Sequence, residues 1–200
     1  MWSWCAPVIV ESQAEDPPIS PQEMRADARR NRDRLIAAAR EAFASGEAKV
    51  SLESVARAAG VGIGTLYRHF PTRESLAEAV YRTEFTALRD SAAELLAELP
   101  PDAALRAWMD RFADYIATKR EMAEALRAVI TATSLPEKRA ELAEAARAVL
   151  EAGAADGSLR ADVLPEDVVA GIVGVFLSCG ADRPEQAGRL LDLLMDALRP

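Results

Sequence analysis

Apolar residues recur every three or four positions through most of the chain, which is the spacing of an amphipathic α-helix. The first such stripe consists of Leu35, Ile36, Ala39 and Phe43. We find no alternating run rich in β-branched and aromatic residues, so we predict an all-α fold. Prolines and glycines divide the pattern into segments. We expect helices at 26–45, 52–59, 63–70, 73–99, 102–118, 120–132, 136–155, 165–180 and 184–198.

Residues 51–70, SLESVARAAGVGIGTLYRHF, contain two short helical patterns separated by a glycine-rich turn. We expect Ser51 to cap the first and Gly60 to adopt the left-handed conformation that ends it. The second pattern separates Leu66 and Phe70 from Thr65, Tyr67, Arg68 and His69. A short helix with one apolar and one polar face is expected to pack on a core with one side and face DNA with the other.

The charge of the chain is unevenly distributed. The total of 24 basic and 32 acidic residues gives −8, which alone argues against nucleic acid. Residues 1–24 carry four acids and no base (−4), residues 25–75 carry ten bases and six acids (+4), and residues 76–200 carry 14 bases and 22 acids (−8). Only the segment with the two-helix pattern is basic, and a local basic surface matters more for DNA than the total charge.

The first 23 residues are acidic and contain several prolines, so we expect 1–23 to be disordered. One hypothesis is that Met24 is the true start of the protein. We expect a DNA-binding domain at 24–71 and a second domain at 72–200. The start of the chain lacks a basic n-region and no apolar stretch is long enough to span a bilayer, so we expect a cytoplasmic protein without membrane contact.

Catalytic and metal-binding patterns are missing from the sequence. The two cysteines, Cys5 and Cys179, are far apart, and His69 is the single histidine. No paired carboxylates, Cys-x-x-Cys spacing or nucleophile–base arrangement is present. We therefore expect no enzyme activity, no catalytic residues, no metal site and no cofactor.

The block at residues 59–76, AGVGIGTLYRHFPTRESL, resembles the signature of TetR-type (tetracycline-repressor-like) transcriptional regulators. The resemblance covers roughly residues 28–80, and the remainder is similar in its helices to the subgroup common in actinobacteria. It implies an Ω-shaped all-α homodimer with an N-terminal three-helix domain on DNA. It also implies a C-terminal ligand pocket and a dimer interface built by the last two helices of each chain.

The resemblance assigns roles to residues of the two-helix motif. Ser51, Tyr67, His69 and Arg73 correspond to positions that contact phosphates. Thr65 and Arg68 are our candidates for reading base edges, and Gly64 lets the helix approach the groove closely. The family often has Ser at position 62 and a polar residue at 63, whereas this chain has Gly62 and Ile63. The predicted DNA-binding set is Ser51, Gly62, Ile63, Gly64, Thr65, Tyr67, Arg68, His69 and Arg73.

Bulky side chains of the second domain are candidates for a pocket or an interface. We expect an apolar or aromatic effector to contact Trp108, Phe112, Tyr115, Met122 and Leu126, for each of which ordinary core packing is the alternative. We expect the dimer interface to contain Val169, Ile172, Val173, Phe176, Leu190 and Leu194.

The leading hypothesis is a homodimeric repressor that binds a pseudo-palindromic operator and is released by a small effector. One alternative is a ligand-binding or scaffold protein of the same fold without DNA function. An activator is also open, because the sequence does not fix the sign of regulation.

Overall fold

The computed structural model describes residues 20–44, 50–122, 126, 134–179 and 183–200. Within these ranges the regular secondary structure is entirely helical, which confirms the all-α prediction. The expected helix at 120–132 lies mostly outside the described residues. The helices are α1 (Pro21–Ala44), α2 (Leu52–Ala58), α3 (Ile63–His69), α4 (Arg73–Glu98), α5 (Pro101–Glu121), α7 (Ser134–Asp156), α8 (Pro165–Cys179) and α9 (Pro184–Leu198).

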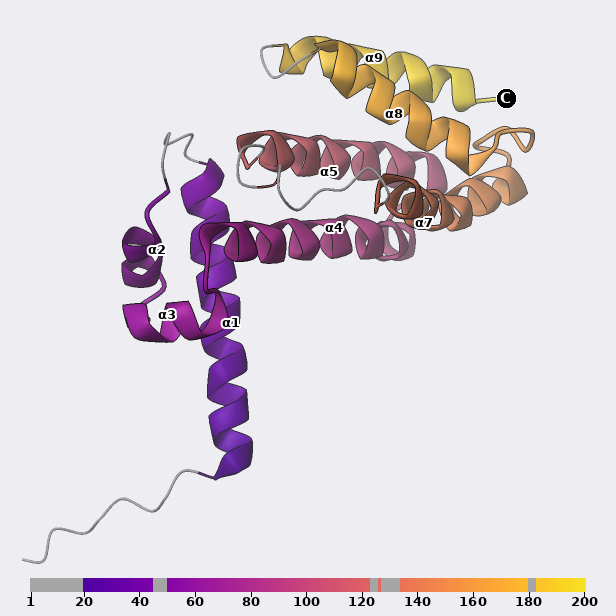
Figure 1. The fold of residues 1–200 in the computed structure, drawn as a ribbon. Helices are drawn as coiled ribbons and strands as arrows, with labels where there is room; N and C mark the ends of the chain where they lie inside the picture. The colour runs from indigo at the N-terminus through magenta and orange to yellow at the C-terminus, as the bar shows by residue number, and fades with distance from the viewer. Residues whose placement is uncertain (1–19, 45–49, 123–125, 127–133, 180–182) are drawn as a thin grey trace, which may run out of the picture.

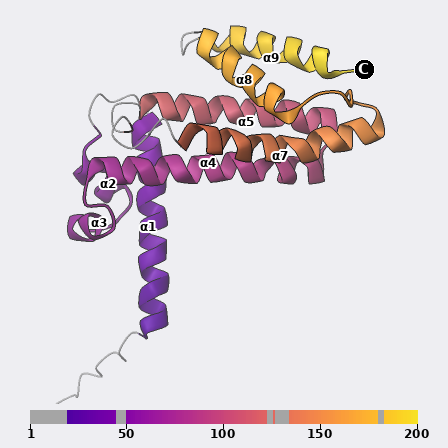
Figure 2. The same ribbon diagram turned by 45° about the vertical axis from the view of Figure 1, so that its right-hand side comes forward.

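The helices form a small N-terminal unit and a larger body that α4 joins (Figure 1). Helix α1 packs against α2, α3 and the start of α4, and its first half projects beyond them. In the body α4, α5 and α7 pack together, and α8 and α9 lie over them as an outer pair (Figure 2). Helix α4 therefore belongs to both parts of the molecule.

A shared apolar core holds the three N-terminal helices together. Leu35 of α1, Val55 of α2 and Leu66 of α3 are fully buried, and Phe43 and Phe70 are nearly so. These are the side chains that the sequence periodicity places on the inner faces. Fully burying one such side chain stabilises a fold by about 1.5–3 kcal/mol, so this core fixes how α3 is presented.

Helix α1 begins at Pro21, so the expected start at 26 and the expected disorder of 21–23 are wrong. The Ser20 amide donates to the Glu23 carboxylate at 2.8 Å, and the Glu23 amide donates to the Ser20 hydroxyl at 3.2 Å. These two bonds form a capping box, and Pro21 occupies the first helical position, where its missing N–H costs nothing. This local cap stabilises the start of the helix, although the acidic, proline-containing composition of the segment favours disorder. Residues 1–19 lie outside the described part of the chain.

The turn between α2 and α3 has the geometry that its glycine predicts. Gly60 has a φ of 65°, in the left-handed region that side chains with a Cβ disfavour. Its amide donates to the Arg57 carbonyl at 3.1 Å, and the Val61 amide donates to the Ala56 carbonyl at 2.9 Å. This bond pair is a Schellman motif. It turns the chain within a few residues and sets the angle between α2 and α3.

Helix α4 begins after a capping box formed by Thr72 and Ser75. The Thr72 hydroxyl accepts from the Ser75 amide at 3.1 Å, and the Ser75 hydroxyl accepts from the Thr72 amide at 3.2 Å. The helix then continues for 26 residues to Glu98 and is followed by Pro100, which caps α5. One rigid element therefore runs from the end of α3 into the body.

We expect Gly60→Ala to lower the free energy of unfolding by about 1 kcal/mol, because alanine must adopt the left-handed conformation there. The nearest atom to an added Cβ is 3.9 Å away, so conformational strain rather than a clash sets this cost. Gly64→Ala is the matched control. It adds a methyl group in open space within α3 and should raise stability by about 0.5–1 kcal/mol. Urea denaturation followed by circular dichroism measures both. A Gly60→Ala protein as stable as the parent would contradict the assigned geometry.

Candidate functional site

Helix α3 has one buried face and one exposed face. Leu66 and Phe70 point into the core, whereas Ile63 and Tyr67 are 40% and 46% exposed. Gly62 caps the helix with extended backbone angles, and an added Cβ at Gly64 would meet nothing within 4 Å. The outer side of α3 therefore carries two glycines around the exposed Ile63 at its start and larger polar side chains further along, as the sequence predicts.

The Arg68 side chain lies back along α3. Its Nη2 donates to the Thr65 hydroxyl at 3.0 Å, and its Nε donates to the Gly64 carbonyl at 3.2 Å. The two residues predicted to read bases are thus in contact with each other. A guanidinium has more donors than these two bonds use, so Arg68 can remain on Thr65 and still donate to another group.

Arg73 and His69 lie at the edge of the exposed face. The guanidinium carbon of Arg73 is 5.9 Å from the centre of the Phe43 ring. Its Nε is buried and has no hydrogen-bond partner among the described residues. Arg73 therefore also packs the junction between α1 and α4. His69 is half-buried, with its ring 6.2 Å from that of Phe70.

Ser51 occupies the N-cap position of α2, as predicted, but its side chain does not cap the helix. Its hydroxyl instead donates to the Glu53 carboxylate at 2.6 Å. The hydroxyl is exposed on the outside of the N-terminal unit. A phosphate contact by Ser51 would therefore replace an existing bond to an acidic side chain.

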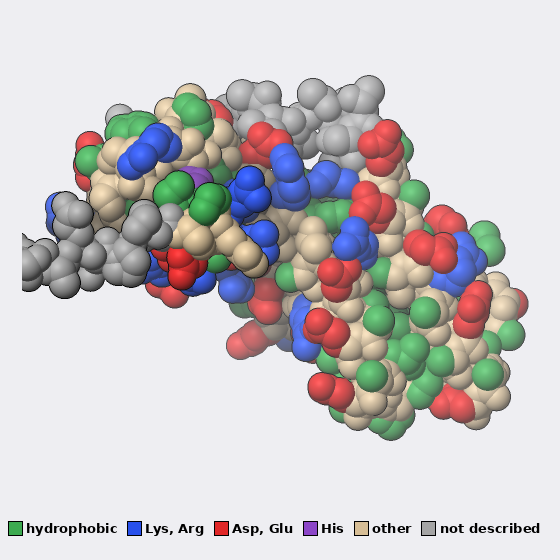
Figure 3. Space-filling view, turned by 90° about the horizontal axis from the view of Figure 1, so that it is seen from below, with side chains coloured by type: hydrophobic (Ala, Val, Ile, Leu, Met, Phe, Trp, Pro, Cys, Tyr) green, Lys and Arg blue, Asp and Glu red, His purple; other side chains and the backbone are tan. Residues whose placement is uncertain are grey.

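Arginines extend the exposed face of α3 onto α1. The guanidinium carbon of Arg32 lies 5.4 Å from the centre of the Phe70 ring, and Arg30 donates to Asp27. Figure 3 looks onto the underside of the molecule, where Lys and Arg side chains gather at the N-terminal unit and its junction with the body. The body beyond that junction shows more acidic side chains. Helix α1 carries Arg25, Arg29, Arg30, Arg32, Arg34 and Arg40.

A cavity of about 560 Å³ lies inside the body, between α4, α5, α7 and α8. Of the predicted ligand residues, the structure brings Phe112, Tyr115 and Leu126 to its wall. The sequence analysis missed the remaining described lining, which comes from four helices. It comprises Tyr81, Phe85, Ile116, Lys119, Arg120, Lys138, Arg139, Leu142, Val173, Phe176 and Leu177.

Stacked aromatic rings form one wall of the cavity. The rings of Tyr81 and Tyr115 are 5.7 Å apart, and those of Phe112 and Phe176 are 6.4 Å apart. Burial raises the pKa of both the Tyr81 and the Tyr115 hydroxyl. Both phenols therefore stay neutral, and the wall offers flat apolar surface together with one polar pair. The i, i+4 spacing of Tyr81 and Phe85 is a signal from which these α4 residues were predictable.

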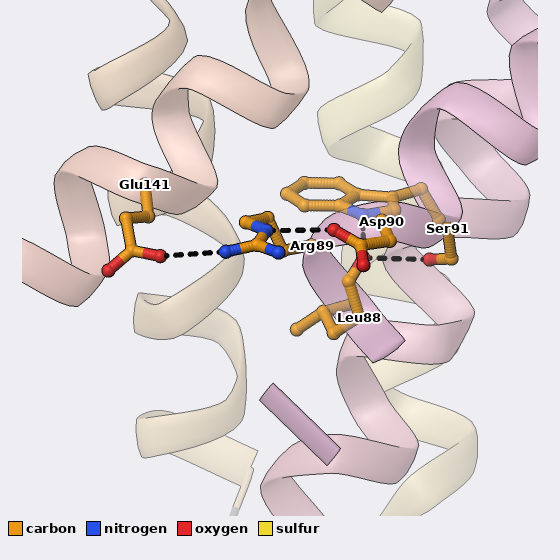
Figure 4. Close-up of polar contacts among 6 residues, drawn as sticks. Leu88, Arg89, Asp90, Ser91 and Glu141 are labelled. Carbon is orange, nitrogen blue, oxygen red and sulfur yellow. Dashed lines mark hydrogen bonds and ion pairs between the residues drawn. The ribbon is translucent and has the colours of Figure 1, made fainter. Parts of the chain in front are cut away.

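Trp108 and Met122 are core residues, which corrects their assignment to the ligand pocket. Both are buried and neither lines the cavity. The Trp108 indole donates to the Leu88 carbonyl at 2.9 Å, and the Ser91 hydroxyl donates to the same carbonyl at 2.8 Å (Figure 4). This bond orients the indole toward α4 and away from the cavity. Beside it, Arg89 ties α4 to α7 through Glu141 at 3.3 Å.

The predicted interface residues divide into buried and accessible ones. Val169, Ile172 and Phe176 are buried within the protomer, so they are core residues and their assignment to a dimer interface is corrected. Val173, Leu190 and Leu194 keep part of their surface exposed. Leu193 of α9, which was not predicted, is 63% exposed, and Leu177 of α8, which shares the apolar face of the predicted α8 residues, is 76% exposed at the edge of the cavity.

Two other kinds of site are not found within the described residues. No group of three or more His, Cys, Asp or Glu side chains is arranged to hold a metal ion. None of the described helices is both long and apolar enough to cross a membrane.

Family models match most of the chain. Residues 35–80 match the model of bacterial regulatory proteins of the tetR family. Residues 100–200 match the model of the C-terminal domain of SbtR-like transcriptional regulators. No curated protein matches. The first model matches residues of the N-terminal unit and the start of α4, and the second matches the helices of the body that follow α4.

Solved structures of regulators are similar to this chain over nearly their whole length. A TetR transcriptional regulator from Streptomyces coelicolor is 48% identical, covers 84% of this chain and 98% of its own, and has a TM-score of 0.74. A TetR regulatory protein from Mycobacterium vanbaalenii is 31% identical, with 88% and 99% covered and a TM-score of 0.70. A third, described as the basis for control of antibiotic production by bacterial hormones, is 27% identical, with 84% and 97% covered and a TM-score of 0.64.

We expect Trp108→Phe to lower the free energy of unfolding by about 1–3 kcal/mol, because it removes a buried hydrogen bond and leaves a void. Tyr67→Phe is the control, since it changes an exposed aromatic side chain and should shift stability by less than about 0.5 kcal/mol. Urea denaturation measures both. If Trp108→Phe instead left stability unchanged and altered ligand binding, Trp108 would have to be assigned to the ligand pocket again.

Proposed function

The chain belongs to the TetR family of bacterial regulatory proteins, and from this membership we propose that it is a homodimeric repressor released from its operator by a small molecule. It is a DNA-binding transcriptional regulator, and its family is regulatory rather than enzymatic. Dimerisation, repression and effector response are the proposed part. Because its proposed target is chromosomal DNA, we also propose that it acts in the cytoplasm.

The observation that carries the DNA-binding mode is the outer face of α3. Its inner face is fixed by the buried Leu66 and Phe70, so the outer face is presented as a rigid surface. We propose that this face enters the major groove, with the smooth start of α3 closest to the bases. Ile63, which is exposed, is suited to contact a thymine methyl group.

We propose that different residues supply affinity and sequence choice. Tyr67, His69 and Ser51 are placed to donate to phosphates, which dominate affinity. Arg68, held on Thr65, is suited to donate to a guanine edge. Arg73 contributes charge near the start of α4 while its stem packs on Phe43.

We propose that α8 and α9 form the interface with a second copy of the chain. The two helices form the outer layer of the body and present the exposed Leu177 and Leu193. The partly exposed Leu190 and Leu194 flank Leu193, and an added Cβ at Gly174 would meet nothing within 4 Å. Packing these faces by two-fold symmetry would cover apolar surface and allow two α3 helices to reach successive major grooves.

We propose that the cavity holds the effector and that α4 transmits its binding. Tyr81 and Phe85 line the cavity from α4, and Tyr81 lies eight residues after Arg73, which corresponds to about 12 Å of helix. A ligand that displaces these rings would tilt α4 and move α3 with it. The similar structure that concerns control by bacterial hormones supports a small-molecule signal.

The DNA-binding proposal is tested by gel-shift titration against DNA that flanks the gene. Arg68→Ala should reduce the preference for the operator over scrambled DNA by about 1–3 kcal/mol, because a base contact is lost. Tyr67→Phe combined with His69→Ala should weaken binding to both DNAs and flatten its dependence on salt, because phosphate contacts are lost.

Arg111→Ala is the control for both, since Arg111 is an exposed residue of α5 paired with Glu94 at 3.4 Å. It should leave DNA binding unchanged. If neither α3 variant differed from this control, the alternative of a family member without DNA function would be favoured.

The dimer proposal is tested by light scattering after size exclusion. Leu193→Arg should shift the protein toward monomer and weaken operator binding, because it places a charge in the middle of an apolar interface. Leu164→Arg is the matched control, since Leu164 is 61% exposed and precedes α8. A Leu193→Arg protein that remained a dimer would exclude this face.

A further inference from the structure

The cavity wall carries four basic side chains and, among the described residues, no acidic one. Lys119 and Arg120 come from the end of α5, and Lys138 and Arg139 come from the start of α7. The rest of the described wall is apolar or aromatic. Because the whole chain has more acidic than basic residues, composition does not account for this gathering of charge.

Among the described residues, most of these cations have no acidic partner in a salt bridge. Lys119, Lys138 and Arg139 form no salt bridge with any described residue, and Arg120 donates to the Phe176 carbonyl. Several other arginines of the body form salt bridges with acidic side chains. Arg106 pairs with Asp192 at 2.8 Å, and Arg147 pairs with Glu144 at 3.0 Å. The cavity therefore gathers three cations that form no salt bridge with a described residue.

The two lysines are held against aromatic rings in a partly buried environment. The Lys138 ammonium lies 4.3 Å from the centre of the Phe85 ring and 4.4 Å from that of Tyr81. Burial lowers the pKa of Lys119, and the charges of Lys138 and Arg139 lower it further. Burial also lowers the pKa of Lys138, and the charge of Arg82 lowers it further, against the attraction of Glu141 and Glu78. An anion at this place would relieve the repulsion and restore both pKa values.

We propose that the effector is an amphipathic organic anion, with an apolar or aromatic body inside the cavity and a carboxylate head group bound by Lys119, Lys138 and Arg139. This inference rests on the proposed function, which places the effector in this cavity. The volume of about 560 Å³ is within the range that encloses a drug-sized ligand. The wall formed by Phe112 and Phe176 offers a flat apolar surface for its body.

Binding of the same head group would also change the contacts between α7 and α4. The two rings under the Lys138 ammonium belong to α4, whereas Lys138 belongs to α7. An anion that draws this ammonium away weakens the cation–π contacts between the two helices. Binding of the head group would therefore alter the packing of α4, the helix that begins beside α3.

The inference is tested by calorimetric titration of the full-length protein with matched probes. Three apolar bodies, phenylbutyl, naphthylmethyl and decyl, each carry a carboxylate, a primary amide or a primary ammonium group. For at least one body the carboxylate should bind about tenfold or more tightly than its amide, because it gains charge-assisted hydrogen bonds. The ammonium probe should bind most weakly. Sulfonate probes with the same bodies show whether a different anionic head group serves equally well.

Substitutions then locate the head group. Lys119→Met and Lys138→Met keep the length of the side chain and remove its charge, and each should reduce the preference for the carboxylate severalfold. Removing either charge relieves repulsion, so neither variant should melt at a much lower temperature without ligand. Arg111→Met, the control, makes the same charge change on the outer side of α5 and should keep the parent's preference.

Three results would overturn the inference: amides that bind as tightly as carboxylates, a carboxylate preference that survives both lysine substitutions, or no binding by any probe. Gel shifts on the same preparations separate this outcome from the proposed function. Operator binding without carboxylate binding would refute the anionic effector and leave the regulator in place. Carboxylate binding without any effect on operator binding would support the site and contradict its proposed role in release.

Discussion

The stability of α3 and the orientation of its exposed face depend on the burial of Leu66 and Phe70. A helix of seven residues has little stability of its own, because nucleation of a helical turn is unfavourable. Contact with the core that contains Leu35 and Val55 holds it in place, and the Schellman turn at Gly60 sets its direction. The exposed residues can therefore be small, polar or basic without loss of the fold, so this surface is open to selection for binding.

Helix α4 joins the two parts of the molecule because it meets different neighbours along its length. Its first turn is capped by Thr72 and packed by Arg73 against Phe43. Further along, Tyr81 and Phe85 face the cavity, and the Leu88 carbonyl accepts the Trp108 indole. A straight helix transmits displacement along its axis, so a change at the rings reaches the end of α3 without a separate relay. This continuity is the physical basis of the proposed release.

The local features of the fold were predictable from sequence, and the tertiary ones were not. Gly60 and Thr72 act through bonds within a few residues, so their roles follow from spacing alone. The capping box of Ser20 and Glu23 is equally local and was readable, but composition was given more weight. The direction of the Trp108 side chain depends on the Leu88 carbonyl of another helix. Likewise, periodicity marks Ile172 as apolar but cannot say whether its own protomer or a partner buries it.

The two proposed sites use charge in the same way. At both, several basic side chains that form no salt bridge with a described acid lie together, although the chain carries a net charge of −8. On α1 and α3 the cations are exposed, where a polyanionic backbone can meet them. In the cavity, Lys119 and Lys138 are partly buried, where a phosphate backbone cannot enter and a small anion can. Exposed acidic side chains on the face of the body shown in Figure 3 repel DNA from that surface. The net negative charge of the chain is therefore compatible with two anion-binding sites. The exposed site on α1 and α3 can meet DNA, and the cavity admits only a small anion.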